Sequence, residues 1–506
     1  MFLLSHSAIF AVFSSAKRKW VLGVVMLIMG VSSLYAQSWT APPTLPVFGS
    51  SDFNVTISNP SIDGGATVST NNTPSINASV IDAFINYCST NQTGGLGGTV
   101  EVPAGIYSLN PIILNSNVNL QIDPGCVLSN AVYTNTLITS SGKTNMEISG
   151  GGVIEGGAMT APGGNKLVYL QGVNTLEVTN VSVEDSGNEH LVVENDINVT
   201  ISGVTIADPG TLKANNGNYL ANTDGIDFYG TNFLIKNCSV NDGDDNICAK
   251  PASGGCANIV ITNCAIGVGH GISIGGGTSH GLSNMLVTDC SFNGTVNGLR
   301  IKACDSSWSN SLVQDYGGGL ANPVTNVTYR NITMTNVTNP IILESFYNGN
   351  DNLPTNKVTS PTNLSYYPSI PTVVNSTTPM YEGISFDNIQ ITNAGNAGIF
   401  EGLNTTTPNI NGLSFSNVTI SASQEMVMWY ATNVSIIGVS VTIPQDNPYA
   451  NASPIAGSWT YDASVTIVPE PSTPVLCLLG LAGALLCWRF GWYRGADVCK
   501  RSDQRQ

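Results

Sequence analysis

A short motif that returns at regular intervals through the middle of the chain constrains the fold more than any other feature. Asn is followed three positions later by an apolar residue, and two positions after that by Gly, Asn or Asp. The clearest copies are Asn198–Val204, Asn232–Cys238, Asn258–Cys264 and Asn284–Cys290. The interval from Asn237 to Asn263 to Asp289 is 26 residues each time, and elsewhere it ranges from about 21 to 57. A period in the twenties indicates a solenoid, in which each repeat forms one coil.

The residues inside each repeat predict strands. β-Branched residues are frequent and apolar positions alternate, a period-2 pattern that helical repeats do not show. We therefore predict an all-β fold, a right-handed parallel β-helix over 50–467, whose coils pair at a spacing of about 4.8 Å. Equivalent residues of successive coils then stack in columns. Cys238, Cys264 and Cys290 form one such column, for which we predict packing in the interior.

A helix is expected before the first coil. Residues 76–87 have helical periodicity and follow Thr73-Pro74-Ser75, which suits a helix N-terminus. Such a helix would cover the open edge of the first coil, whose backbone groups otherwise lack partners. The many Asn-x-Ser/Thr sequences inside the repeats are interpreted as turn positions and Asn stacks rather than as glycan sites.

Charge is scarce and unevenly distributed. Charged residues make up 10 % of the chain, under half of the roughly 25 % that is usual, which excludes charge-driven disorder and a coiled coil. Of the 17 basic residues, three lie in 1–36 and five in 489–506, which leaves nine against 31 acidic residues in 37–488. A body with a net charge of −22 will not bind nucleic acid non-specifically, because that binding depends on Lys and Arg neutralising phosphates.

Both ends of the chain resemble sorting signals. Residues 1–36 combine Lys17-Arg18-Lys19 with an apolar run and a small residue before Gln37, as a secretory signal peptide does. Residues 468–506 hold a Pro-Glu-Pro motif, an apolar stretch from Val475 to Phe490 and a basic tail. This arrangement resembles the PEP-CTERM sorting signal of Gram-negative bacteria, which implies a transmembrane segment and recognition by sorting machinery in the membrane. We expect an exported protein of the cell envelope or the extracellular space, with the C-terminal segment as a membrane anchor or a removed tail.

Four successive coils align through their apolar residues and place polar residues in one column. Asp224, Asp245, His270 and Asn297 begin these coils, at intervals of 21, 25 and 27 residues. Asp244 stands beside Asp245. Carboxylates stacked in this way repel one another, an arrangement that is costly without a use.

The cations lie two coils further on. Arg300 and Lys302 share parity, so they leave the same face of their strand. Asp and Gly are also ordinary turn residues, but a solvated turn does not need this set of acids, a histidine and two cations. We therefore predict a functional site here.

The same residues carry a resemblance to glycoside hydrolase family 28, the polygalacturonases. The matching motifs are Asn222-Thr223-Asp224, Gly243-Asp244-Asp245, Gly269-His270-Gly271 and Arg300-Ile301-Lys302, in the family's order and spacing. The resemblance implies hydrolysis of α-1,4 bonds between galacturonate residues of pectic polysaccharides by an inverting single displacement.

The resemblance also implies a role for each residue. Asp244 would be the general acid, Asp224 and Asp245 would activate the attacking water, and His270 would tune the acid. Arg300 and Lys302 would bind the substrate carboxylate. Asn222 and Tyr347 are further substrate-binding candidates. No metal or cofactor is implied, and we expect a monomer.

Some features depart from the family pattern or leave alternatives open. Asn246 stands where the family often has Cys, and loops 304–322 and 346–380 are unusually long. Carboxylates about 5 Å apart would fit a retaining mechanism, whereas the family implies inversion. A pectate lyase would need a Ca²⁺ cluster and a basic proton abstractor, for which Lys250 is the spare cation. A non-catalytic carbohydrate-binding β-helix is the third alternative. His190 and His280 are interpreted as surface or turn residues.

Overall fold

The computed structural model describes residues 42–90, 96–157, 160–305, 316–347, 349, 374–403, 408–424, 426–443, 459–461 and 467–468. All of these belong to one compact unit, Pro42–Gln506. The predicted signal peptide and the predicted C-terminal transmembrane segment lie outside the described residues. Within the described ranges, no helix combines the length and the apolar character that crossing a membrane would require.

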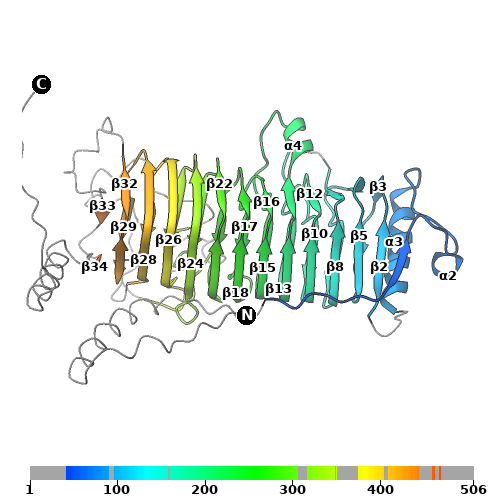
Figure 1. Cartoon of the computed structure of the whole chain (residues 1–506), viewed down its shortest axis with the longest axis horizontal. Coiled ribbons are helices and arrows are strands. Elements are labelled where there is room, and N and C mark those ends of the chain that lie inside the picture. Colours follow the sequence, from blue (N-terminus) through cyan, green and yellow to red (C-terminus); the bar gives the residue numbers. More distant parts are fainter. Residues whose placement is uncertain are drawn as a thin grey trace, which may run out of the picture. The chain divides into compact units, whose positions relative to one another are not determined.

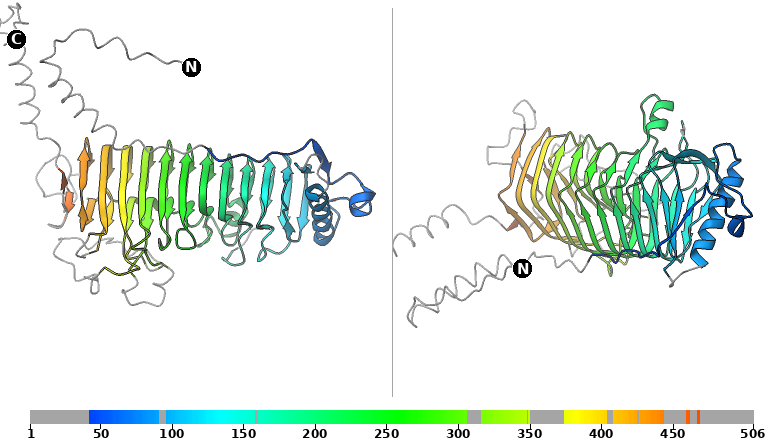
Figure 2. Two further views of the ribbon diagram at one scale, coloured as in Figure 1. Left: turned by 90° about the horizontal axis from the view of Figure 1, so that it is seen from below. Right: turned by 45° about the vertical axis from the view of Figure 1, so that its right-hand side comes forward.

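The predicted parallel β-helix is confirmed. Strands stack one behind another along a single axis (Figures 1 and 2), and each pairing between the named strands discussed below is parallel. Each coil contributes to three faces, which we number in the order in which a coil of the N-terminal half passes through them. Five long strands bend round a corner and serve two faces: β13 (Leu191–Ser202), β15 (Ile226–Lys236), β24 (Val324–Thr335), β26 (Tyr381–Ala394) and β28 (Ile410–Ala422).

The first face runs the whole length of the solenoid. Besides parts of the five long strands, it contains β1 (Ser51–Asn54), β2 (Gly98–Val102), β5 (Val118–Ile122), β8 (Thr144–Gly150), β11 (Asn174–Thr179), β18 (Cys256–Thr262), β21 (Leu282–Thr288), β30 (Ala431–Thr432), β31 (Val434–Ile437) and β34 (Ile467–Val468).

The second face is made of shorter strands. Besides parts of β24, β26 and β28, these are β3 (Gly105–Leu109), β6 (Cys126–Asn130), β9 (Val153–Glu155), β12 (Ser182–Glu184), β14 (Thr205–Ala207), β16 (Ser239–Val240), β19 (Ala265–Ile266), β22 (Ser291–Asn293) and β32 (Ser440–Thr442).

The third face carries the predicted site. Besides the first halves of β13 and β15, it contains β4 (Ile112–Ile113), β7 (Ile138–Ser141), β10 (Val168–Gln171), β17 (Ile247–Ala249), β20 (Ile272–Ile274), β23 (Asn297–Lys302), β25 (Asn339–Glu344), β27 (Ile399–Glu401), β29 (Met426–Trp429) and β33 (Trp459–Tyr461).

Asparagine ladders explain the repeated motif. Each Asn at the start of the motif donates a side-chain hydrogen bond to the Asn of the preceding coil, at 3.1–3.2 Å, through the series Asn174, Asn198, Asn232, Asn258, Asn284 and Asn326. From Asn198 onward, all of them have φ between 53° and 63°. Asn tolerates this left-handed conformation better than other non-glycine residues. The prediction of Asn stacks is therefore confirmed.

The interior is apolar and the first coil is capped. Tyr329, Phe386 and Phe415 stack with ring centroids 5.3 and 5.0 Å apart. The predicted capping helix is present as α3 (Pro74–Thr90), which begins two residues earlier and ends three later than the periodicity indicated. The hydroxyl of Thr73 accepts from the backbone N–H of Ile76 at 3.4 Å. Two further helices are short, α2 (Pro60–Asp63) and α4 (Pro209–Ala214), and α4 projects from the solenoid (Figure 1).

The cysteine column is interior, as predicted. Cys238, Cys264 and Cys290 are each 2 % exposed, and none of the eight cysteines among the described residues forms a disulfide. Asn246 is buried and joins two coils: its amide donates to the carbonyl of Val268 at 2.8 Å and its oxygen accepts from the N–H of Gly271 at 2.7 Å.

The interpretation of His190 as a surface or turn residue is wrong, whereas His280 is exposed as expected. His190 is completely buried, and its Nε2 lies 2.9 Å from Oδ1 of Asp208, the residue that precedes α4. Its Nδ1 lies 3.1 Å from the carbonyl oxygen of Asp224. The burial of His190 could not be predicted, because its partner Asp208 belongs to the insertion that carries α4, and an insertion of this kind leaves no signal in the repeat.

Candidate active site

The alignment of the polar column agrees with the strand register. Ile226 pairs with Ile247, Ile247 with Ile272, and Ile272 with Leu299. The residues two positions before them, Asp224, Asp245, His270 and Asn297, therefore begin successive coils at one edge of the third face. The turn before Asp244 requires glycine, because a β-carbon at Gly243 would overlap the carbonyl oxygen of Leu220.

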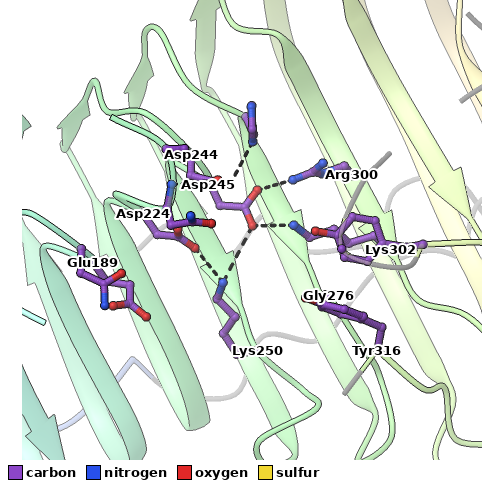
Figure 3. A pocket seen from close by; sticks show the side chains of 15 residues that line it. Glu189, Asp224, Asp244, Asp245, Lys250, Gly276, Arg300, Lys302 and Tyr316 are labelled. Carbon is purple, nitrogen blue, oxygen red and sulfur yellow. Dashed lines mark hydrogen bonds and ion pairs between the residues drawn. The ribbon is translucent and has the colours of Figure 1, made fainter. Parts of the chain in front are cut away.

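These turns open onto a cavity of about 820 Å³. Figure 3 shows the side chains that converge on it. All eight predicted site residues line the cavity, together with seven others: Asn188, Glu189, Asn222, Ala221, Asp224, Asp244, Asp245, Lys250, His270, Gly276, Arg300, Lys302, Tyr316, Tyr347 and Gly349.

Asp245 is the most strongly bound of the carboxylates. It is 1 % exposed, and its Oδ1 accepts from the Arg300 guanidinium and, at 2.8 Å, from the Ser273 hydroxyl. Its Oδ2 accepts from Nζ of Lys302 at 2.8 Å. Burial alone would raise the pKa of Asp245, but Lys302 and Arg300 together hold that pKa well below its usual value. Asp245 is therefore ionised throughout the ordinary pH range.

Asp244 forms a pair with His270. Oδ1 of Asp244 lies 3.0 Å from Nδ1 of His270, and its Oδ2 accepts from the backbone N–H of Asn222 at 3.3 Å. Burial raises the pKa of Asp244, but the hydrogen bond from His270 and the charges around it outweigh burial, so the pKa lies below its ordinary value. In the free site Asp244 thus favours the ionised form.

A third group of charges surrounds Lys250. From the sequence, the only role predicted for Lys250 was that of the base in a lyase. Its Nζ lies 2.7 Å from Oδ2 of Asp224, 3.1 Å from Oδ2 of Asp227 and 3.9 Å from Oδ2 of Asp245. Burial lowers the pKa of Lys250, yet Asp224 and Asp227 raise it well above its normal value, so the ammonium stays charged.

Asp227 was not recognised from the sequence. The alternation of side chains along the strand could have revealed it, because Asp227 stands between the interior residues Ile226 and Phe228 and therefore faces outward. In the strand register it occupies the same position as Ser273 and Arg300 two and three coils further on. Burial raises the pKa of both Asp224 and Asp227, the nearby carboxylates add to the rise, and Lys250 opposes it.

Aromatic rings close the cavity on the side of the cations. The ring centroid of Tyr347 lies 4.8 Å from Nζ of Lys302 and 6.0 Å from the Arg300 guanidinium. Tyr316 meets Tyr347 edge to face at 5.0 Å. Tyr316 was also missed, because it follows an insertion that carries no repeat from which to place it.

Comparison with known proteins assigns the family. The model of the glycosyl hydrolases family 28 matches residues 96–368, more than half of the chain. The chain belongs to glycoside hydrolase family 28. It is therefore a glycoside hydrolase, and its polar column, from Asp224 to Asn297, lies within the matched residues. A PEP-CTERM protein-sorting motif matches residues 468–494.

Relatives of this family 28 hydrolase include named polygalacturonases. An endo-polygalacturonase of Pectobacterium carotovorum subsp. carotovorum is 28 % identical over 321 residues, which cover 53 % of this chain and 72 % of the relative. A polygalacturonase of Malus domestica is 33 % identical over 177 residues, 34 % of either chain.

Solved structures share the fold. The polygalacturonase from Erwinia carotovora ssp. carotovora has a TM-score of 0.55 at 21 % identity and covers 85 % of this chain and 99 % of its own. The Yersinia enterocolitica family 28 exopolygalacturonase has a TM-score of 0.58 at 16 % identity, with coverages of 84 % and 79 %.

Proposed function

We propose that this family 28 hydrolase cleaves α-1,4 bonds between galacturonate residues of pectin-type polysaccharides in a single displacement with inversion. The observation that carries the proposal is the convergence, in one open cavity, of three carboxylates, a histidine and the Arg300–Lys302 pair. The names of the relatives support the substrate, and the cations suit a sugar that bears a carboxylate.

In this proposal Asp244 protonates the leaving oxygen. Its pKa is low in the free site, so it must gain a proton when substrate binds or when the medium is acidic. A polyanionic sugar chain that fills the cavity favours this, because both loss of water and added negative charge raise the pKa of a carboxyl group. His270 then governs how readily Asp244 keeps that proton.

Asp245 and Asp224 orient the attacking water. Asp245 remains ionised because Lys302 and Arg300 face it, and an ionised carboxylate accepts a proton or a hydrogen bond from water. Asp224 is held by Lys250, whose Nζ lies 2.7 Å from its Oδ2. Asn222 and Tyr347 line the same cavity, and we propose that they contact the sugar.

Two alternatives predict different products. In a lyase Lys250 would remove a proton from the sugar, but its raised pKa and its ion pairs with Asp224 and Asp227 keep it protonated. A possible cation cluster of Asp244, Asp245 and His270 has ligand atoms within 4.8 Å of one another. In this cluster the carboxylate of Asp245 already forms ion pairs with Arg300 and Lys302, and Asp244 and His270 contact each other. These contacts compete with a bound cation. A non-catalytic binding protein would give no product at all.

One experiment separates these functions. Polygalacturonate is incubated with the enzyme and the first product is followed by NMR, with Asp244→Asn as the inactive variant and the exposed Asp52→Asn as a matched control. We expect a β-configured new end, which is inversion, and a loss of about 10²–10⁴-fold in Asp244→Asn. An α-configured end would indicate retention, an unsaturated end would indicate a lyase, and more than a tenth of the activity in Asp244→Asn would refute the role of Asp244.

The PEP-CTERM motif indicates export and sorting to the cell envelope. We propose further that residues 1–36 are removed on export and that sorting machinery in the membrane recognises the C-terminal segment and either cleaves it or leaves it as an anchor. A polysaccharide too large to enter a cell fits an enzyme that works outside it.

A further inference from the structure

The end of the cavity beyond Asp224 is acidic. Glu189 lines it, together with Asn188, just before strand β13 begins (Figure 3). Oε1 of Glu189 lies 3.7 Å from Nζ of Lys166, a long contact between half-exposed groups. Oε2 of Glu189 is buried and has no hydrogen-bond partner in the protein. Glu189 therefore presents a carboxylate that its surroundings satisfy only in part.

The cations that line the cavity are engaged elsewhere. Lys250 binds Asp224 and Asp227, whereas Arg300 and Lys302 both bind Asp245. Lys166 does not line the cavity, and its ammonium also lies 5.4 Å from the centre of the Tyr169 ring. The negative charge of Glu189 also acts on Asp227, because repulsion between the two carboxylates contributes to the raised pKa of Asp227. Among the described residues, no cation that lines the cavity compensates Glu189.

Glu189 and the cation pair stand at opposite ends of the cavity (Figure 3). Strand β13 pairs with β15, and β17, β20 and β23 follow in register, so Leu191 and Leu299 are four coils apart. At the usual spacing between paired strands, four coils separate the strand backbones by about 19 Å, and the side chains of Arg300 and Lys302 reach back as far as Asp245. The catalytic carboxylates lie between the two ends. A polysaccharide laid along the cavity therefore meets Arg300 and Lys302 on one side of the cleaved bond and Glu189 on the other.

We propose that Glu189 selects a galacturonate residue whose carboxyl group is esterified, at the subsite on the Asp224 side of the cleaved bond. This rests on the proposed pectin hydrolysis. An ionised sugar carboxylate beside Glu189 would be repelled by a like charge in a partly buried site, whereas a methyl ester carries no charge. The enzyme then prefers bonds that are flanked by an ester on one side and a free acid on the other.

The test reads the ester pattern around the cleaved bonds. Partially methyl-esterified oligogalacturonides of random pattern are digested by the full enzyme, and mass spectrometry locates the esters on the two new ends of each product. We expect esters enriched at one new end and depleted at the other. In Glu189→Gln the enrichment should fall about 5- to 10-fold, because the like charge is gone, and kcat/KM on fully de-esterified polygalacturonate should rise. Glu177→Gln, which removes the same charge outside the cavity, should change neither.

The outcomes separate this inference from the proposed function. An equal ester content at both new ends, or an enrichment that Glu189→Gln leaves unchanged, would overturn the role of Glu189 although pectin is still cleaved. Added salt provides a second measurement: discrimination by the wild type should weaken between low and high ionic strength, because screening reduces repulsion between partly exposed charges. If no galacturonan is cleaved under any condition, the proposed function itself fails.

Discussion

At the scale of single residues, the site consists of acids whose pKa values are shifted in opposite directions by their surroundings: down for Asp244 and Asp245, up for Asp224 and Asp227. Asp245 faces two cations, Asp244 faces His270, and Asp224 shares Lys250 with Asp227. The motifs were enough to predict that the first three acids converge, because strand register is fixed by the repeat. The role of Lys250 could not be predicted, because it depends on which of several acids its long side chain reaches.

Replacement of Lys250 should make Asp224 harder to ionise. The pKa of Asp224 is already raised by burial, and Lys250 limits the rise, so Lys250→Met should raise it further. A base works only above its pKa, so the acidic limb of the kcat/KM profile should move to higher pH. Lys250→Arg should restore much of the wild-type profile. A lower rate with an unmoved limb in Lys250→Met would mean that Lys250 acts only on folding.

Replacement of His270 should shift the opposite limb. The hydrogen bond from His270 lowers the pKa of Asp244, so His270→Ala should raise that pKa. An acid works below its pKa, and the alkaline limb of the pH profile should therefore extend to higher pH while kcat falls. Because the two limbs report macroscopic values of the coupled acids, both variants should be measured on one substrate. An alkaline limb that moves to lower pH would contradict the role of His270.

At the scale of secondary structure, the sequence predicted what repeats and missed what does not. The Asn-containing motif correctly predicted strands and parallel stacking, and the helical periodicity of residues 76–87 correctly predicted the capping helix α3. Neither pattern could predict the contact between His190 and Asp208, the residue before α4, or the placement of Tyr316 beside Tyr347, because insertions that interrupt the period make both contacts. Insertions depend on contacts with several coils, and a local pattern does not contain that information.

The Asn ladder should contribute measurably to stability. Asn258 donates to Asn232 and accepts from Asn284, both at 3.2 Å, and has φ of 57°. Asn258→Ala loses two hydrogen bonds and replaces Asn by a residue that adopts the left-handed conformation less readily, which together cost about 2–3 kcal/mol of unfolding free energy. Asn258→Gly keeps the conformation accessible and should cost less.

Urea unfolding followed by circular dichroism measures this difference. Asn71→Ala, an exposed residue outside the ladder, should change the unfolding free energy by less than about 0.5 kcal/mol. If Asn258→Ala is as stable as Asn71→Ala, the ladder is a consequence of strand stacking and does not contribute to it.

At the scale of the whole molecule, the acidic charge of the body and the C-terminal sorting motif both affect how the enzyme meets its substrate. The body between the two terminal segments is strongly acidic, so we expect a polyanionic pectin to be repelled at long range, and we propose that it binds where Arg300 and Lys302 lie. Screening by salt weakens the long-range repulsion more than the short contacts inside the cavity. Attachment to the cell envelope would keep such an enzyme near a polymer that it does not attract from a distance.

The C-terminal motif should therefore decide where the enzyme acts, without affecting how it acts. The PEP-CTERM match covers 468–494, whereas the cavity is built from residues between Asn188 and Gly349. A chain that ends at residue 468 should keep its kcat and KM but move from the envelope fraction of the producing cell to the medium. Replacement of Pro469, Glu470 and Pro471 by Ala in the full chain should mimic the truncation, since it removes the recognition motif and leaves the apolar stretch in place. Immunoblots of cell fractions, with activity measured on polygalacturonate in each, give the distribution. Retention of both altered chains in the envelope would show that a different part of the molecule holds the enzyme there.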